Sequence, residues 1–145
     1  MQIRLAVPDD LARIMQLLHQ LNPDDPAPSH AEVEVFAEIL ASPRFRLIVA
    51  DDGGILVGTC YLNIIPNLSR GARPYALIEN VVTETACRRR GIGSAVIRHA
   101  LQLAWDANCY KVMLLSGRKE PAIQAFYESC GFVADQKQAY VQRAR

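Results

Sequence analysis

The chain has 145 residues, of which 50% are hydrophobic and 21% are charged, and its formal net charge is +1 at pH 7. These values are typical of one globular domain with a substantial core, so we expect a single domain over residues 1–145. The near-neutral charge and the lack of a long apolar run exclude a global basic field and a membrane span, so we expect no nucleic acid and no membrane partner.

The spacing of the cysteines indicates the redox compartment of the protein and whether a metal site is expected. Cys60, Cys87, Cys109 and Cys130 are widely spaced, and none belongs to a C-x-x-C pair. We therefore expect no metal site, a reducing compartment, and buried Cys60 and Cys109 among their apolar neighbours. Residues 1–10 do not have the pattern of a signal peptide, which agrees with a cytoplasmic location.

The first part of the chain predicts a strand, two helices and a hairpin. Alternating apolar residues predict a strand at 3–7, and a helix follows from Pro8 to about Leu21. Residues 22–28 contain three prolines and predict an irregular loop. Ser29 and Glu32 form a capping box for the second helix, which ends at 42–43.

The middle of the chain predicts two paired strands. Residues 45–50 and 55–65 are apolar, and the aspartates and glycines at 51–54 predict a hairpin turn between them. Gly58 is expected at a bulge in the return strand. Residues 67–73 are polar and predict a mobile loop.

A strand, a basic glycine turn and a helix are predicted next. Residues 75–82 form the strand, three arginines follow at 88–90, and helical spacing of apolar residues begins after Gly91 and continues to Asn108. The first amides of a helix lack internal partners and carry positive potential, and arginines add charge. This combination predicts a site for an anion such as pyrophosphate, with a surface loop of solvated arginines as the alternative.

The end of the chain predicts a strand, a helix and two short strands. Residues 110–115 predict a further buried strand, and Pro121 suits the first turn of a helix that Gly131 ends. Residues 132–133 and 139–141 predict a closing pair of strands.

Two motifs resemble the signatures of one enzyme family. Arg88-x-x-Gly91-x-Gly93 is similar to the R/Q-x-x-G-x-G/A signature of the GCN5-related N-acetyltransferases (GNAT family), and Tyr127-x-x-x-Gly131-Phe132 resembles a second signature of that family. Within that family, the glucosamine-phosphate N-acetyltransferases are resembled by residues 78–82, 109–112 and 126–132. This resemblance indicates kinship within the superfamily and does not identify the substrate. The resemblance implies an α/β fold with a mixed, mostly antiparallel central sheet of about six to seven strands and helices on both faces.

The same resemblance implies an acetyl-CoA-dependent N-acetyltransferase. Its cosubstrate would be acetyl-CoA, and a primary amine of a small molecule, or less often of a protein, would attack the thioester directly in a ternary complex. The implied cofactor-binding residues are Val81, Val82, Thr83, Arg88, Arg89, Arg90, Gly91, Ile92, Gly93, Ser94 and Glu120. The amide of Val82 would polarise the acetyl carbonyl, and Glu120 stands where the family often has an asparagine beside the pantetheine arm.

Two residues are candidates for catalysis. The resemblance implies that Tyr127 donates a proton to the departing thiolate, and the alternative is a core tyrosine whose hydroxyl is satisfied. Glu79 interrupts an apolar strand, where a buried charge is costly unless it is paired or used. If Glu79 is partly buried there, it would suit the role of a general base, acting directly or through water. The alternative is a structural carboxylate paired with an arginine such as Arg73. Regular pairing would place Asn80 on the opposite face from Glu79.

Other functions stay open on the sequence alone. The chain could be a non-catalytic CoA-binding sensor or partner module, or a phosphate-binding regulatory domain without CoA specificity. The acceptor would be bound by the loops at 22–30 and 66–73, and Arg70 and Arg73 in the second loop favour an acidic or phosphorylated acceptor. A homodimer is an open alternative to a monomer.

Overall fold

The computed structural model describes residues 1–145, which divide into two compact units, 1–114 and 115–145. The single domain that we expected stays a prediction, and each unit is described by itself. The strands are β1 (Gln2–Leu5), β2 (Phe45–Asp51), β3 (Leu56–Ile65), β4 (Tyr75–Thr83) and β5 (Val112–Leu114). The helices are η1 (Pro8–Asp10), α1 (Leu11–Leu21), α2 (His30–Ala41), α3 (Ser69–Ala72), η2 (Thr85–Cys87), α4 (Ile92–Asp106) and α5 (Pro121–Ser129).

The strands of the first unit form one mixed sheet in the order β1-β2-β3-β4-β5. The first four strands are antiparallel neighbours, and β5 is parallel to β4. The predicted α/β class and the mostly antiparallel sheet are therefore confirmed. The sheet has five strands, however, and not the six to seven that we expected.

The missing strands are those predicted at the end of the chain. Residues 132–133 and 139–141 form no strand, and Val133, Tyr140 and Val141 are largely exposed. A segment of two or three apolar residues gains too little stability from backbone pairing to form a strand by itself. Two further predictions were too long, because β1 ends at Leu5 and β5 is a short, half-buried strand.

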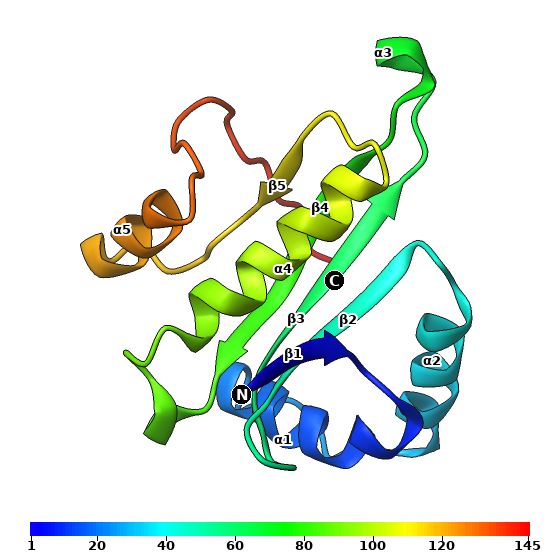
Figure 1. Ribbon diagram of the computed structural model, residues 1–145, viewed down its shortest axis with the longest axis vertical. Helices are drawn as coiled ribbons and strands as arrows, with labels where there is room; N and C mark the ends of the chain where they lie inside the picture. The colour runs from blue at the N-terminus through cyan, green and yellow to red at the C-terminus, as the bar shows by residue number, and fades with distance from the viewer. The chain divides into compact units, whose positions relative to one another are not determined.

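Helices cover both faces of the sheet in the first unit. Side chains of α1 and α2 pack with Leu47 and Val49 of β2 in one apolar cluster. Because side chains alternate along a strand, Ile48 and Ala50 face the other side, where α4 lies along β2, β3 and β4 (Figure 1). Cys60 is buried, as expected, and burial raises the pKa of its thiol to about 12.

Gly58 lets the start of α4 approach the sheet closely. A Cβ atom at this position would lie 2.9 Å from Cγ2 of Ile92 and 3.4 Å from the carbonyl oxygen of Val82. Gly58 also lies beside the bulge in the β2–β3 pairing, where the register shifts between Ala50 and Asp51. The glycine is therefore needed for packing of α4 on β3.

Replacing Gly58 by alanine should destabilise the fold. The added methyl group would push Ile92 at the first turn of α4, and overpacking of this kind costs about 1–3 kcal/mol. Denaturant unfolding would measure the loss. Gly117→Ala is the matched control, because no atom lies within 4 Å of a Cβ there. Equal stability of the two variants would contradict the close-packing argument.

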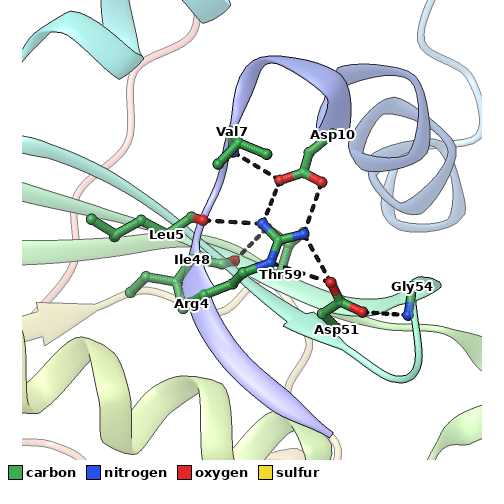
Figure 2. A network of polar contacts seen from close by, with 8 residues as sticks. All are labelled: Arg4, Leu5, Val7, Asp10, Ile48, Asp51, Gly54 and Thr59. Carbon is green, nitrogen blue, oxygen red and sulfur yellow. Dashed lines mark hydrogen bonds and ion pairs between the residues drawn. The ribbon is translucent and has the colours of Figure 1, made fainter.

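A polar network holds the N-terminal segment to the sheet (Figure 2). The Arg4 guanidinium lies between two carboxylates, donating to Asp10 at 2.7 and 3.1 Å and to Asp51 at 3.2 and 3.0 Å. Asp10 also accepts a hydrogen bond from the amide of Val7 at 2.8 Å, and Asp51 accepts one from Gly54 at 2.7 Å. One arginine therefore ties the start of α1 to the hairpin between β2 and β3.

Candidate active site

The predicted anion site lies at the junction of η2 and α4. Gly91 caps α4 with a φ of 77°, and the first helical hydrogen bond runs from the amide of Ala95 to the carbonyl of Gly91 at 3.0 Å. The amides of residues 92–94 therefore have no partner inside the helix, and they carry the positive end of its dipole. The Ile92 side chain is buried, so this residue can offer a ligand its backbone amide only.

The three arginines of the turn are exposed but have different surroundings. Arg90 lies 3.4 Å from a carboxylate oxygen of Asp52, in the hairpin between β2 and β3. Arg88 and Arg89 make no hydrogen bond or ion pair, and Arg89 has a φ of 61°. Two guanidinium groups are thus available to an anion at the start of α4, while Arg90 is partly neutralised.

The end of β4 next to this turn has an open edge. Pairing of β4 with β5 covers only Ala76–Ile78, whereas pairing with β3 continues to Thr83. The backbone groups of residues 79–83 on the β5 side are therefore not used in the sheet. An extended ligand can add to such an edge as a strand does.

β4 contains a bulge that the sequence analysis missed. Tyr61 of β3 pairs with Glu79 and Thr59 pairs with Val82, so Cys60 lies opposite both Asn80 and Val81. Asn80 has a φ of 53°, in the left-handed region. The regular alternation that we expected for Glu79 and Asn80 is therefore wrong. Asparagine tolerates this conformation better than most residues, which was the one signal in the sequence.

Neither the partial burial nor the pairing with Arg73 that the sequence allowed for Glu79 is found. Its side chain is exposed, because the bulge ends the buried alternation of β4 before the apolar pattern resumes at Val82. Arg73 does not pair with it, and donates instead to the carbonyls of Asn108 and Cys109, both at 3.2 Å. Glu79 therefore stands exposed beside the open edge of β4, and a role as general base stays a prediction.

A second polar network joins α1 to the end of β4. Glu84 accepts hydrogen bonds from Arg13 and from Gln20, the latter at 2.9 and 3.0 Å, and these bonds lower the pKa of the Glu84 carboxyl. Gln20 also accepts from the amide of Thr85 at 3.1 Å. Sequence reasoning missed these residues, because no local pattern reports a contact between a helix and a turn about 65 residues later. The network fixes the chain just before the arginine turn.

The loop between β3 and β4 holds the two arginines that we considered for an acidic acceptor. It contains the short helix α3, in which Arg70, Gly71 and Ala72 have φ between 58° and 69°. The Arg70 guanidinium lies 5.6 Å from the ring centre of Tyr110. Arg70 is exposed and can meet a ligand, whereas Arg73 is engaged with backbone carbonyls.

The second unit contains α5 and the two remaining predicted site residues. Tyr127 is half-buried, and its ring centre lies 4.9 Å from that of Phe126 and 6.2 Å from that of Phe132. Glu120 caps the start of α5, and its carbonyl accepts from the amide of Ile123 at 3.0 Å. The roles of both residues stay predictions.

Comparisons with known proteins give the family. The family model described as "Acetyltransferase (GNAT) family" matches residues 11–132. The glucosamine 6-phosphate N-acetyltransferase of Trypanosoma brucei brucei is 31% identical over 140 residues, which cover 95% of this chain and 92% of that protein. A relative from Oryza sativa subsp. japonica, named probable glucosamine 6-phosphate N-acetyltransferase 2, is 33% identical over 137 residues, covering 90% and 80% of the two chains.

Solved structures agree with this assignment. A structure from Agrobacterium tumefaciens str. C58, provisionally described as an acetyltransferase, has a TM-score of 0.92 and 49% sequence identity, covering 99% of this chain and 100% of that one. No helix in the structure has the length and apolar character needed to cross a membrane. The family match over residues 11–132, together with the two relatives, shows that this chain belongs to the acetyltransferase (GNAT) family, the GCN5-related N-acetyltransferases.

Proposed function

We propose that this N-acetyltransferase moves the acetyl group of acetyl-CoA to the primary amine of a small molecule. Enzymes of its family use acetyl-CoA as the acetyl donor. The observation that carries the proposal is the continuity of the open edge of β4, at 79–83, with the arginine and glycine turn at the start of α4. An extended pantetheine arm and a pyrophosphate would be bound by two adjacent parts of one segment.

The proposed cofactor contacts divide between backbone and side chains. Val81, Val82 and Thr83 would hydrogen-bond the pantetheine arm with backbone groups that the sheet does not use. The amides of residues 92–94 and the free guanidinium groups of Arg88 and Arg89 would bind the pyrophosphate. The amide of Val82 would polarise the acetyl carbonyl, since a fixed donor at that atom stabilises the developing negative charge.

The proposed proton transfers involve two side chains. Glu79 is exposed beside the open edge of β4 and would accept the proton of the attacking amine, directly or through water. Tyr127 would donate a proton to the thiolate as it leaves. Glu120 would contact the pantetheine arm through its backbone or its side chain.

For the acceptor, we propose an amino sugar phosphate as the first candidate. The two relatives from Trypanosoma and Oryza are named for activity on glucosamine 6-phosphate. The exposed guanidinium of Arg70 would favour a phosphorylated acceptor. Charge-assisted hydrogen bonds to a phosphate are strong enough to favour such a substrate by about tenfold or more in kcat/KM.

The test is a thiol-release assay with an acceptor panel. Glucosamine 6-phosphate, glucosamine, spermidine and a lysine-containing peptide would each be added with acetyl-CoA. We expect thiol release to require an acceptor and to be fastest with glucosamine 6-phosphate. Tight binding of acetyl-CoA without turnover of any acceptor would favour the non-catalytic CoA-binding module.

Replacing Tyr127 by phenylalanine tests its role as the acid. We expect kcat to fall by about 100-fold, because loss of a general acid removes assistance of at least that size, while the acetyl-CoA affinity stays within about twofold. Tyr140→Phe is the matched control, because Tyr140 is 88% exposed. An unchanged kcat in Tyr127→Phe would assign Tyr127 to packing with Phe126 and Phe132.

A further inference from the structure

Glu84 lies between the two parts of the proposed acetyl-CoA site. The open edge of β4 ends at Thr83, and η2, which leads to the arginine turn, begins at Thr85. The pantetheine arm and the pyrophosphate are joined covalently in acetyl-CoA, so the edge and the turn must keep one fixed relation to bind both at once. The direction in which the chain leaves β4 at Glu84 sets this relation.

The backbone of Glu84 is fixed on both sides. Its amide donates to the carbonyl of Val57 at 2.8 Å, which continues the pairing of β3 with β4 by one residue beyond Thr83. Its carbonyl accepts from the amide of Cys87 at 2.8 Å, across η2. One residue therefore ends the strand pairing and starts the turn.

The side chain of Glu84 is fixed by α1. Its carboxylate accepts from both Arg13 and Gln20. The Arg13 guanidinium also donates to the carbonyl of Leu56, at the start of β3, at 3.0 Å. The side chains of Glu84 and Arg13 are only 19% and 29% exposed, and partial shielding from water strengthens charge-assisted hydrogen bonds of this kind.

Gln20 also holds the first residue of η2. Its side-chain oxygen accepts from the amide and the hydroxyl of Thr85 at 3.1 and 3.0 Å, while its side-chain nitrogen donates to Glu84. One side chain of α1 thus contacts two consecutive residues between the edge and the turn. Neither Gln20 nor Arg13 belongs to residues 79–83 or 88–94, so they would act on a cofactor only through other residues.

From this arrangement, we propose that Gln20 and Arg13 are positioning residues for acetyl-CoA. They hold Glu84 and Thr85 so that the edge of β4 and the arginine turn bind the two halves of the cofactor together. This inference rests on the proposed function, because it takes the edge and the turn as the cofactor site. It adds a role for α1, which contributes no residue to that site. Without these contacts each half of the site remains, but the two halves are no longer held in register.

Gln20→Leu tests the proposal by comparing acetyl-CoA with its two halves. The variant removes the contacts to Glu84 and Thr85 with a side chain of similar size. Calorimetry should give an acetyl-CoA affinity about tenfold lower than in the parent protein, because the two halves no longer bind as one ligand. ADP has the pyrophosphate without the arm, and S-acetylpantetheine has the arm without the pyrophosphate. In ligand-observed NMR titrations, each should keep the parent affinity within about twofold.

Gln16→Leu is the matched control. Gln16 lies one turn earlier on α1 and accepts from Arg13 at 3.0 Å, but it is exposed and has no hydrogen bond to Glu84 or Thr85. This variant should bind acetyl-CoA as the parent protein does. Glu84→Gln is a second variant, which keeps the side-chain size and removes the charge. It should lose about threefold or more in acetyl-CoA affinity and also keep its affinity for ADP. Circular dichroism would show that each variant is folded.

Steady-state kinetics give a readout that a general loss of structure would not produce. With the acceptor that the thiol-release panel identifies, the KM for acetyl-CoA in Gln20→Leu should rise by about tenfold. The kcat at saturating acetyl-CoA should stay within about twofold of the parent value, because the reacting groups remain in place once both halves are bound. A fall in kcat with an unchanged KM would contradict a positioning role for the cofactor.

The outcomes separate this inference from the proposed function. Failure of the parent protein to bind acetyl-CoA would contradict the proposed function itself. Binding by the parent protein with equal affinity in Gln20→Leu would contradict only the positioning role. A parallel loss of ADP affinity in folded Gln20→Leu would also overturn the inference, because the network would then shape the turn alone and not the relation between the two halves.

Discussion

Gly91→Val is expected to reduce the affinity for acetyl-CoA by about tenfold or more. Gly91 caps α4 with a φ of 77°, a left-handed conformation that a β-branched residue rarely adopts. Relief of the strain, which is worth about 1–3 kcal/mol, would move the amides of residues 92–94 away from their present directions. Calorimetric titration with acetyl-CoA, in the absence of an acceptor, would measure the loss.

The control for this variant is a glycine with the same backbone strain at another place. Gly71 has a φ of 69° in α3, and like Gly91 it has no atom within 4 Å of a Cβ position. Gly71→Val should therefore lose similar stability but retain the parent affinity for acetyl-CoA. If both variants bound acetyl-CoA equally well, the turn before α4 would not be the pyrophosphate site.

Arg4→Met is expected to lower the free energy of unfolding by about 2–4 kcal/mol. The substitution leaves the carboxylate of Asp10, a residue only 8% exposed, without the guanidinium that neutralises it (Figure 2). Removing one partner of a buried ion pair is costly, because the other charge stays desolvated. Arg44→Met is the matched control: Arg44 is exposed and its side chain has no partner, so the change should be under about 0.5 kcal/mol.

The effect of Arg4→Met should depend on pH. The hydrogen bonds from Arg4 hold the pKa of Asp10 below its ordinary value of 3.8, and the amide of Gly54 with Arg4 lowers that of Asp51. A carboxyl whose pKa is lower in the folded state stabilises the fold above its unfolded pKa and loses this contribution as the pH falls through the folded value. The difference between Arg4→Met and the parent should therefore shrink from about pH 5 to about pH 2. A constant difference would exclude the ion pair as its cause.

Local signals in the sequence predicted most of the elements. Ser29 and Glu32 form the predicted capping box at the start of α2, with the Glu32 carboxylate 2.6 Å from the amide of Ser29. Asn108 and Gly131 follow α4 and α5 with φ of 63° and 93°, as expected for residues that end helices. These features involve neighbours along the chain, so their residue types carry the information directly.

The position of the proposed anion site follows from the sequence for the same reason. The arginines at 88–90, Gly91 and the start of α4 are consecutive, so their order alone places guanidinium groups and free amides together. The resemblance in the turn and in Tyr127-x-x-x-Gly131-Phe132 then indicated the family that the comparisons show. The open edge of β4 could not be read in this way, because it depends on where the pairing with β5 stops.

The contacts between distant segments could be learned only from the tertiary structure. The bulge at Asn80 arises from the register between β3 and β4, and it leaves Glu79 exposed where apolar neighbours suggested burial. The binding of Glu84 by Arg13 and Gln20, and of Asp10 and Asp51 by Arg4, joins residues that share no local pattern. Strand register and side-chain pairing depend on how whole elements pack. Because one sequence contains many arginines and carboxylates, each of them has several alternative partners. The sequence by itself therefore determined most of the elements, the ends of the helices and the arginine and glycine turn before α4. Packing decided which predicted strands form, which charges meet and which are exposed.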